Sequence, residues 1–231
     1  MLDSDALVFS YKTEKNDYKE LPIAKYTYIL GIDIGFEDAD ALAVLAFNDA
    51  SRHTYLCKEV VTKKQGLTEL VNQIEILQKE YDISKIVMDM GGLGKKIAEE
   101  IIRRYKIPVE AAEKSRKNEY IELLNDALRT GSLLIKANSR FAHDAMRVEW
   151  DLDKSTPERK VVSKRYHSDI CDAVLYAWRC SYSFTYEAPK AKPMYGSKEY
   201  WDEEAQRLEE QAEEHFKNLE EMTKIEDPFK F

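Results

Sequence analysis

The chain has 231 residues, enough for one ordinary domain with an appendage, and 44% of them are hydrophobic, which is sufficient for a core. No segment approaches the roughly 20 apolar residues that span a bilayer, and the charged residues 1–20 lack the apolar stretch of a secretory signal. Cys57, Cys171 and Cys180 are widely spaced and form no Cys-x-x-Cys pair, which predicts a reducing, cytoplasmic setting without disulfides or structural zinc.

The first part of the chain predicts a linker followed by a small antiparallel meander. Residues 1–27 are polar and show no sustained periodicity, so we expect a leader or linker there. Three apolar or alternating runs with short turns between them then predict three consecutive strands, at residues 28–35, 41–47 and 54–62. Apolar residues recur at helical spacing over residues 67–81, which predicts a helix.

The rest of the body alternates between strands and helices. Further strands are predicted at residues 85–89, 108–111 and 133–135. Further helices are predicted at residues 95–105, 115–130, 141–150 and 169–183, the second of them capped by Ser115 and stopped by Gly131. Residues 151–165 predict a polar hairpin with Pro157 at its tip. This order predicts an α/β fold in which a mixed sheet carries helices on its faces.

Charge is unevenly distributed along the chain, whose net charge is −8. Residues 186–231 contain 13 acidic and 7 basic side chains, and we expect an acidic, partly helical or flexible tail there, as a solvated extension rather than a docking element. The predicted domains are therefore residues 1–27, 28–185 and 186–231. Residues 95–117 and 154–165 are locally basic, which favours phosphate binding, although each alone also fits an ordinary solvated face.

Four aspartates lie at the ends of predicted strands or at the start of a predicted helix. Asp33 stands between two isoleucines in a Gly-x-Asp-x-Gly segment, Asp89 follows an apolar strand, and Asp169 and Asp172 begin an apolar helix. A buried carboxylate is costly to desolvate unless it is paired or holds a metal, and no basic residue is adjacent in sequence to Asp33 or Asp89. Hard oxygen ligands suit Mg²⁺ or Mn²⁺, so the four acids together predict a site for a pair of divalent ions.

Each of these acids except Asp33 has a simple structural alternative. Asp169 fits a helix cap or first-turn acid, Asp172 fits a solvated first-turn acid, and Asp89 fits a turn residue before Gly91. The combination is therefore more specific than any single member of the set.

The segments that carry these acids resemble the nuclease domain of the large terminase subunit of tailed bacteriophages. The motifs are Gly31-Ile32-Asp33-Ile34-Gly35, Met88-Asp89-Met90-Gly91-Gly92 and His167-x-Asp169-x-x-Asp172-Ala173. The resemblance covers about residues 28–184, and the family belongs to the ribonuclease H-like group that includes Holliday-junction resolvases.

This resemblance implies a ribonuclease H-like mixed sheet flanked by helices and a metal-dependent endonuclease. The implied reaction is two-metal hydrolysis of double-stranded DNA during viral genome packaging, with two Mg²⁺ or Mn²⁺ ions. Asp33 would bridge both ions, Asp89 would hold one, and Asp169 or Asp172 would hold the other.

Other residues are candidates for supporting roles. The predicted hairpin leads directly to Asp169, and its basic residues are the first candidates for DNA phosphate contacts: Lys154, Arg159, Lys160, Lys164 and Arg165. A second candidate set is Lys95, Lys96, Lys114, Arg116 and Lys117. Asp38 and Asp40 are candidates for an outer shell, and His167 fits either proton transfer or a structural hydrogen bond.

The resemblance also implies partners: double-stranded DNA, an ATPase motor domain, the portal and the small terminase subunit, in the host cell cytoplasm and without a membrane. The sequence has no Gly-x-x-x-x-Gly-Lys-[Ser/Thr] motif, so we do not expect the motor within this chain. The alternatives are an actin-like sugar kinase or chaperone ATPase, which would need a second phosphate loop, a Holliday-junction resolvase, and a non-catalytic module that binds the packaging motor through the acidic tail.

Overall fold

A computed structural model describes residues 6–35, 39–156 and 160–181, together with the single residues 198, 201 and 205. The chain divides into a unit of residues 1–187 and a unit of residues 188–231, and the described structure belongs almost entirely to the first. Asp38, Pro157, Arg159 and most of the predicted acidic tail lie outside the described residues. The predicted domain boundaries therefore stay predictions.

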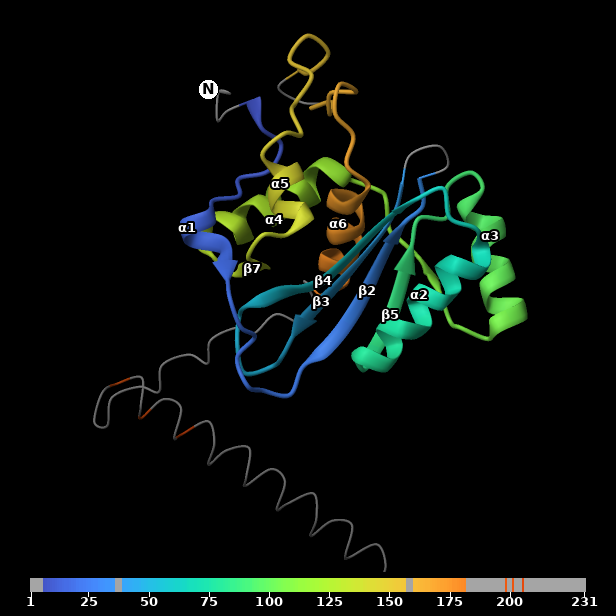
Figure 1. Ribbon diagram of the computed structural model, residues 1–231. Helices are drawn as coiled ribbons and strands as arrows, with labels where there is room; N and C mark the ends of the chain where they lie inside the picture. The colour runs from blue at the N-terminus through green and yellow to red at the C-terminus, as the bar shows by residue number, and fades with distance from the viewer. Residues whose placement is uncertain are drawn as a thin grey trace, which may run out of the picture. The chain divides into compact units, whose positions relative to one another are not determined.

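A mixed sheet of seven strands forms the centre of the described unit (Figure 1). In space the strands follow the order β1-β7-β4-β3-β2-β5-β6. The predicted meander of β2, β3 and β4 is antiparallel, and the other neighbours run parallel. The strands are β1 (Asp17–Tyr18), β2 (Thr27–Asp33), β3 (Ala39–Phe47), β4 (Thr54–Lys63), β5 (Ile83–Met88), β6 (Glu110–Ala111) and β7 (Leu133–Lys136).

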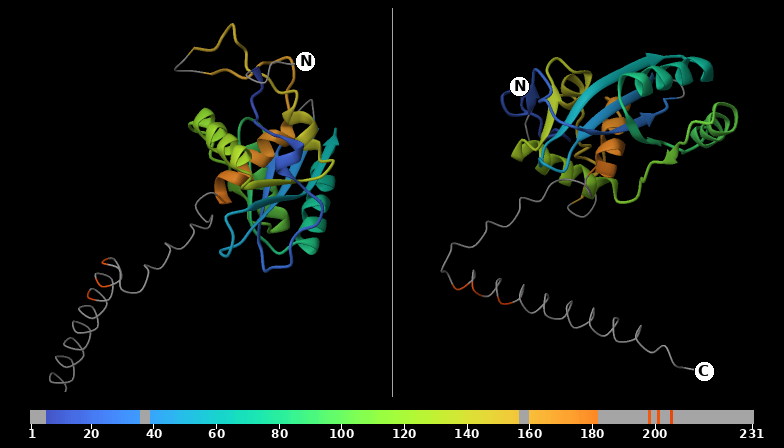
Figure 2. Two further views of the ribbon diagram at one scale, coloured as in Figure 1. Left: turned by 90° about the vertical axis from the view of Figure 1, so that its left-hand side faces the viewer. Right: turned by 90° about the horizontal axis from the view of Figure 1, so that it is seen from below.

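Helices cover both faces of this sheet, because successive strand residues point to opposite sides and both sides are apolar. One face packs against α4 (Lys117–Thr130), α5 (Arg140–Ala145) and α6 (Asp169–Ser181). The other packs against α2 (Leu67–Glu80), α3 (Gly94–Glu100) and a π-helical turn, η2 (Ile101–Tyr105). The two views in Figure 2 show these layers. Among the described residues, no helix is both long and apolar enough to cross a bilayer.

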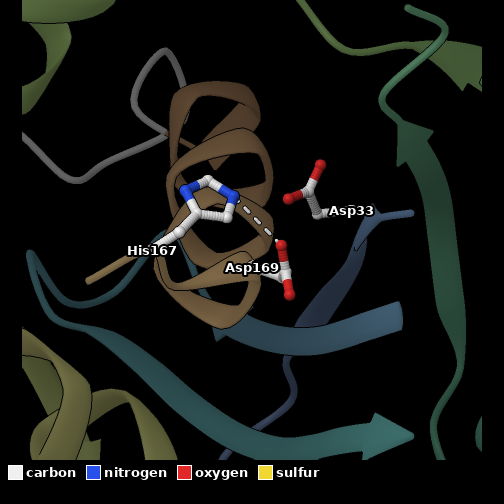
Figure 3. Close-up of side chains that lie close together, drawn as sticks. All are labelled: Asp33, His167 and Asp169. Atoms are coloured by element: carbon white, nitrogen blue, oxygen red, sulfur yellow. Dashed lines mark ion pairs between the residues drawn. The ribbon is translucent and has the colours of Figure 1, made fainter. Parts of the chain in front are cut away.

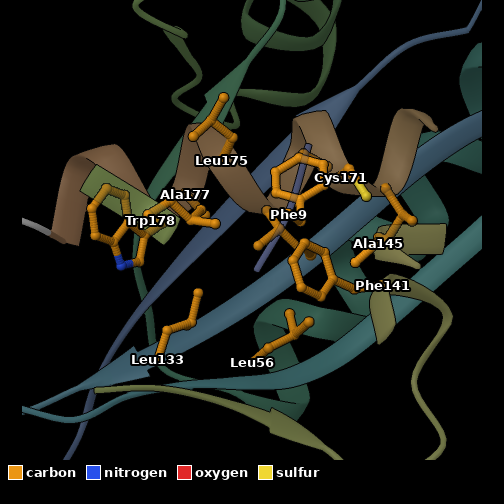
Figure 4. Close-up of a cluster of buried hydrophobic side chains, with 14 of the residues drawn as sticks. Phe9, Leu56, Leu133, Phe141, Ala145, Cys171, Leu175, Ala177 and Trp178 are labelled. Carbon is orange, nitrogen blue, oxygen red and sulfur yellow. The ribbon is translucent and has the colours of Figure 1, made fainter. Parts of the chain in front are cut away.

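Helix α6 occupies the middle of the larger core. Nearly all of its residues are buried, including Leu175 and Trp178. Figure 4 shows these side chains beside Phe141 from α5 and Leu56 from β4. A helix that is buried on almost every side is fixed tightly in place, and α6 carries two of the predicted metal ligands in its first turn.

The amino-terminal segment is part of the fold from residue 6 onward, although its polar composition led us to expect a leader or linker. Val8 and Phe9 are buried in the core beneath α4 and α6. The Asn125 side chain fixes this segment, because its Nδ2 donates to the Val8 carbonyl at 2.7 Å and its Oδ1 accepts from the Ser10 amide at 2.8 Å. A polar side chain such as Asn125 adds nothing to a hydrophobic pattern, so nothing in the sequence indicated that this segment is held in the core.

The same segment continues through α1 (Thr13–Asn16) into β1, which pairs with β7 at the edge of the sheet. Asn16 is fully buried, and its Nδ2 donates to the carbonyl oxygens of Leu128 and Leu133. The edge strand is therefore joined to the end of α4 and to β7 by one side chain.

Two predicted helices are shorter than expected. Ser115 does not cap α4, which begins at Lys117 after Arg116 has adopted a left-handed conformation with φ of 51°. The Ser115 amide donates instead to the Glu113 carboxylate. The helix predicted over residues 141–150 ends at Ala145, because Trp150 pairs with Val162 across the base of the predicted hairpin.

The contact between α6 and β2 depends on Gly31. A Cβ atom at this position would lie 2.1 Å from the backbone carbonyl oxygen of Ala173 in α6, closer than any packed structure allows. Only glycine lets the helix approach the strand this closely, and the approach brings the start of α6 to the end of β2.

We expect Gly31→Ala to lower the free energy of unfolding by about 3 kcal/mol, the upper part of the range for overpacked cores, because α6 must move away from β2. Urea unfolding followed by circular dichroism measures this difference. Gly92→Ala is the matched control, since a Cβ there meets no atom within 4 Å and only the positive φ of 54° opposes it, at about 1 kcal/mol. Equal losses in the two variants would contradict the role of Gly31.

Candidate metal centre

The candidate site lies where neighbouring strands end at one edge of the sheet. Asp33 is the last residue of β2, and its side chain is almost completely buried, with 6% of the residue exposed. Asp89 follows β5 directly, and its amide donates to the carbonyl of Ile32 at 3.0 Å. Because β2 and β5 are parallel neighbours, their carboxyl ends bring these two acids to the same edge.

The first turn of α6 contributes the facing side of the site. Asp33, His167 and Asp169 each offer one ligand atom, and these atoms all lie within 4.8 Å of one another. Figure 3 shows the carboxylates of Asp33 and Asp169 close together, with the imidazole of His167 beside Asp169. The Nε2 atom of His167 lies 3.1 Å from Oδ1 of Asp169. A side chain from the sheet and two from the chain entering α6 thus form one cluster.

The electrostatics of Asp33 are dominated by burial and by the neighbouring acids, and the charge of His167 acts in the opposite direction. Burial raises its pKa from 3.8 to about 8, and the negative charges of Asp172, Asp169 and Asp89 add to the effect. No described residue forms an ion pair with Asp33. The hydrogen bond to Asp169 raises the pKa of His167, since the imidazolium is favoured beside a carboxylate.

Asp89 is neutralised by a lysine from a distant part of the chain. Nζ of Lys114 lies 2.8 Å from its Oδ2, and the Gly91 amide donates to its Oδ1 at 2.7 Å. Burial raises the pKa of Asp89, but these hydrogen bonds outweigh it and hold the pKa below its ordinary value.

Asp172 is neutralised in the same way. Nζ of Lys117, the first residue of α4, lies 2.6 Å from its Oδ1. Sequence reasoning grouped Lys114 and Lys117 with possible DNA contacts and did not identify them as partners of the acids. Nothing near Asp89 or Asp172 in the sequence signals these pairs, which depend on the turn before α4.

A buried acid, Asp144, holds the start of α6 in position. Ser168 caps α6, since its hydroxyl accepts from the Cys171 amide, and the same hydroxyl donates to Asp144 Oδ2 at 2.9 Å. Asp144 is only 3% exposed and also accepts from Tyr166 at 2.6 Å. Ser168 stands between His167 and Asp169, so Asp144 supports both. The sequence analysis missed Asp144, because it lies within a helix without any motif.

The remaining predicted residues lie around this cluster. Asp40 is buried near the start of β3, where burial raises its pKa. In the hairpin, Lys154 pairs with Asp151 at 2.6 Å and Lys160 pairs with Glu122 at 2.6 Å. The other described basic candidates are exposed side chains: Lys95, Lys96, Arg116, Lys164 and Arg165. Of these, Lys164 lines the same cavity as Asp169.

Together, the sheet order, the covering helices and the acids at the sheet edge define a ribonuclease H-like fold, as the sequence predicted. No protein-family model matches the sequence, and no curated protein sequence matches it. Comparison with solved structures, by contrast, finds large terminases of bacteriophages.

Three of these structures illustrate the similarity. A large terminase from a thermophilic bacteriophage has a TM-score of 0.64 at 13% identity, and the alignment covers 74% of this chain and 44% of that protein. The chain therefore spans less than half of that large terminase. The large terminase nuclease of the thermophilic phage G20c, with bound magnesium, has a TM-score of 0.59 at 18% identity, covering 79% of this chain and 98% of that one. The nuclease domain from bacteriophage SPP1, with bound manganese, has a TM-score of 0.55 at 16% identity, covering 72% and 97%.

The pKa of Asp33 predicts an unusual dependence of stability on pH. Between pH 3.8 and about 8 the folded chain keeps the Asp33 proton while the unfolded chain loses it, so the free energy of unfolding falls as pH rises. The loss amounts to at most about 1.4 kcal/mol per pH unit. Asp33→Asn removes this penalty. We expect this variant to melt at a higher temperature than wild type at pH 8 without metal, and the difference to shrink toward pH 4.

Calorimetric melting of both proteins from pH 4 to pH 8 with chelator present measures this difference. Asp82→Asn is the control, because Asp82 is exposed and distant in sequence from the cluster. Melting temperatures of wild type and Asp33→Asn that stay parallel over the whole range would show that Asp33 carries no such proton.

Proposed function

We propose that this chain is a divalent-metal-dependent endonuclease that hydrolyses phosphodiester bonds of double-stranded DNA. The observation that carries the proposal is the buried carboxylate of Asp33, which faces Asp169 at the edge of a ribonuclease H-like sheet and forms no ion pair with a described residue. Such a group is costly in a folded protein unless a cation completes its surroundings. The magnesium and manganese in the G20c and SPP1 structures support the same interpretation.

The donor set fits Mg²⁺ or Mn²⁺. Carboxylate oxygens from Asp33 and Asp169 with the imidazole nitrogen of His167 suit Mn²⁺, and the carboxylates alone suit Mg²⁺ with water. In the proposed arrangement, Asp33, Asp89 and either Asp169 or Asp172 would together hold two ions. When bound, a pair of such ions supplies an activated water and stabilises the leaving oxygen of the scissile phosphate.

The protein's own side chains then have distinct tasks. Asp144 and Ser168 fix the start of α6, so that Asp169 faces Asp33. Lys114 and Lys117 neutralise Asp89 and Asp172, and a metal ion that bound these carboxylates would have to displace the two lysines. His167 orients the Asp169 carboxylate through its hydrogen bond and can hold a proton there.

The biological setting follows from the same similarity. We propose that the cleavage belongs to viral genome packaging, with an ATPase motor domain, the portal and the small terminase subunit as partners. The large terminase that is similar at a TM-score of 0.64 has also been solved in complex with ADP, which supports a link to an ATPase. The similarity covers only 44% of that large terminase. We therefore assign DNA translocation to the parts of the large terminase that this chain does not match.

The test of the function is cleavage of supercoiled plasmid by the purified chain. We expect nicked and linear products with Mg²⁺ or Mn²⁺ and none with chelator. Asp33→Ala and Asp169→Ala should each reduce the rate by more than about 100-fold, beyond the usual effect of changing an outer partner of a metal ligand. Asp82 is an exposed acid directly before β5 in the sequence. Asp82→Ala is therefore the matched control and should retain the wild-type rate. Unchanged cleavage by both site variants would attribute the activity to a contaminant.

The ion pairs of Lys114 with Asp89 and of Lys117 with Asp172 allow a test of which acids bind the metal. If Asp172 is a ligand, an ion must displace Lys117 from it, so Lys117→Met should bind Mn²⁺ several-fold more tightly than wild type. Titration followed by the electron paramagnetic resonance of free Mn²⁺ measures this affinity without any turnover. Lys160→Met, which breaks a surface pair with Glu122 and a cation–π contact with Trp150, is the control. An unchanged affinity in Lys117→Met, with loss in Asp169→Ala, would leave Asp169 as the ligand from α6.

A further inference from the structure

A broad groove reaches the candidate metal centre from the side of β4 and α5. Its volume is about 930 Å³, and Asp169 and His167 lie at one part of its wall. Four basic side chains also line it: Lys63 at the end of β4, Lys64 directly after it, Arg140 at the start of α5, and Lys164 before α6. Apart from Lys164, none of these belongs to the residues expected from the sequence to contact DNA.

Three of these basic side chains have no acidic partner among the residues that the structure describes. Within the described part of the chain, Lys63, Lys64 and Lys164 form no ion pair, and all three are exposed. The other lysines near the centre differ, because Lys114 and Lys117 are bound to carboxylates of the site itself. The groove therefore carries the positive charge that is available to an anionic ligand.

Arg140 is held in place from two directions. The carboxylate of Glu59 in β4 accepts from the Arg140 amide at 2.9 Å and from the Phe141 amide at 2.7 Å, which fixes the start of α5. The side chain is oriented by Asp144, whose Oδ1 lies 2.9 Å from Arg140 Nε. Asp144 is the same buried acid that holds Ser168 at the start of α6. One carboxylate thus sets the position of Arg140 relative to Asp169.

A ligand that matches this groove is extended, polyanionic and in contact with the metal centre. Most of the lining residues are polar or charged, and Ala39, Val61 and Ile170 are the aliphatic residues in the lining. Basic side chains that come from three separate elements suit successive phosphates of a backbone rather than one small anion.

We propose that this groove binds the sugar-phosphate backbone of the DNA on its way to the cut, with Lys63, Lys64, Arg140 and Lys164 as phosphate contacts. The inference rests on the proposed nuclease function and adds to it the course of the DNA. The backbone runs past the end of β4 and the start of α5, and reaches Asp169 from that side. Arg140 would link a bound phosphate to Asp144, the buried acid with which it forms an ion pair.

The test is the affinity for a fluorescently labelled duplex, measured by anisotropy with Ca²⁺ in place of Mg²⁺ to suppress cleavage, at several KCl concentrations. We expect the Lys63→Gln/Lys64→Gln variant to bind about tenfold more weakly at about 0.15 M salt. The slope of log affinity against log salt should fall by about 1.8, which counterion release predicts for two lost phosphate contacts. Lys63→Arg/Lys64→Arg should restore both quantities.

The matched control is Lys58→Gln/Lys79→Gln, which removes the same charge from β4 and from the last turn of α2, outside the groove. We expect its salt slope to equal that of wild type. Thermal melts establish that all variants are folded. Lys63→Glu/Lys64→Glu is a further variant in which repulsion should weaken binding more than the neutral substitutions do.

The groove proposal would be overturned if Lys63→Gln/Lys64→Gln and Lys63→Glu/Lys64→Glu both bound the duplex with the affinity and salt slope of wild type. Equal weakening in the groove and control variants would also overturn it, since the effect would then come from overall charge. Either result leaves metal-dependent plasmid cleavage, and its loss in Asp33→Ala, untouched. If instead the groove variants lose affinity while wild type cleaves nothing with any divalent ion, the groove stands as a DNA-binding surface and the nuclease function fails.

Discussion

The site depends on the close contact between α6 and β2, because this contact brings two carboxylates together from residues more than 130 positions apart in the sequence. The helix can approach the strand only where the strand has no side chain, and Gly31 provides that place two residues before Asp33. The buried length of α6 fixes the helix along its axis, and Ser168 with Asp144 fixes its first turn. The hydrophobic core therefore determines the distance between the carboxylates of Asp33 and Asp169, which repel each other.

Four acids converge on the centre, and the protein treats them unequally. Asp89 and Asp172 have lysine partners at hydrogen-bonding distance, whereas Asp33 is buried among negative charges and Asp169 pairs with the imidazole of His167. The unfavourable energy is thereby concentrated on one carboxylate at the end of β2. A cation bound at that point would remove both the desolvation penalty and the repulsion, and would thereby stabilise the fold.

The sequence predicted the parts of this architecture that repeat along the chain. The meander, the alternation of strands and helices and the acids at the strand ends follow from hydrophobic periodicity and from the cost of a buried charge. Sequence reasoning failed where the structure depends on single side chains that contact residues far away in the sequence. The buried amides of Asn16 and Asn125 hold the amino-terminal segment, the turn at Arg116 directs Lys114 and Lys117 to the acids, and Asp144 supports α6. None of these interactions has a local signature, because each partner lies far away in sequence.

The order of the elements along the chain also has a consequence for biosynthesis. The sheet edge formed by β1 and β7 joins residues 17–18 to residues 135–136, and α6, which fills the centre of the larger core, comes at residues 169–181. Contacts between residues so far apart in the sequence form slowly, and the apolar face of the meander packs against α6 only after residues 169–181 have been synthesised. Nearly all of residues 1–187 would therefore be synthesised before Asp33 can contact Asp169. The acidic cluster would thus assemble only after α6 has been synthesised.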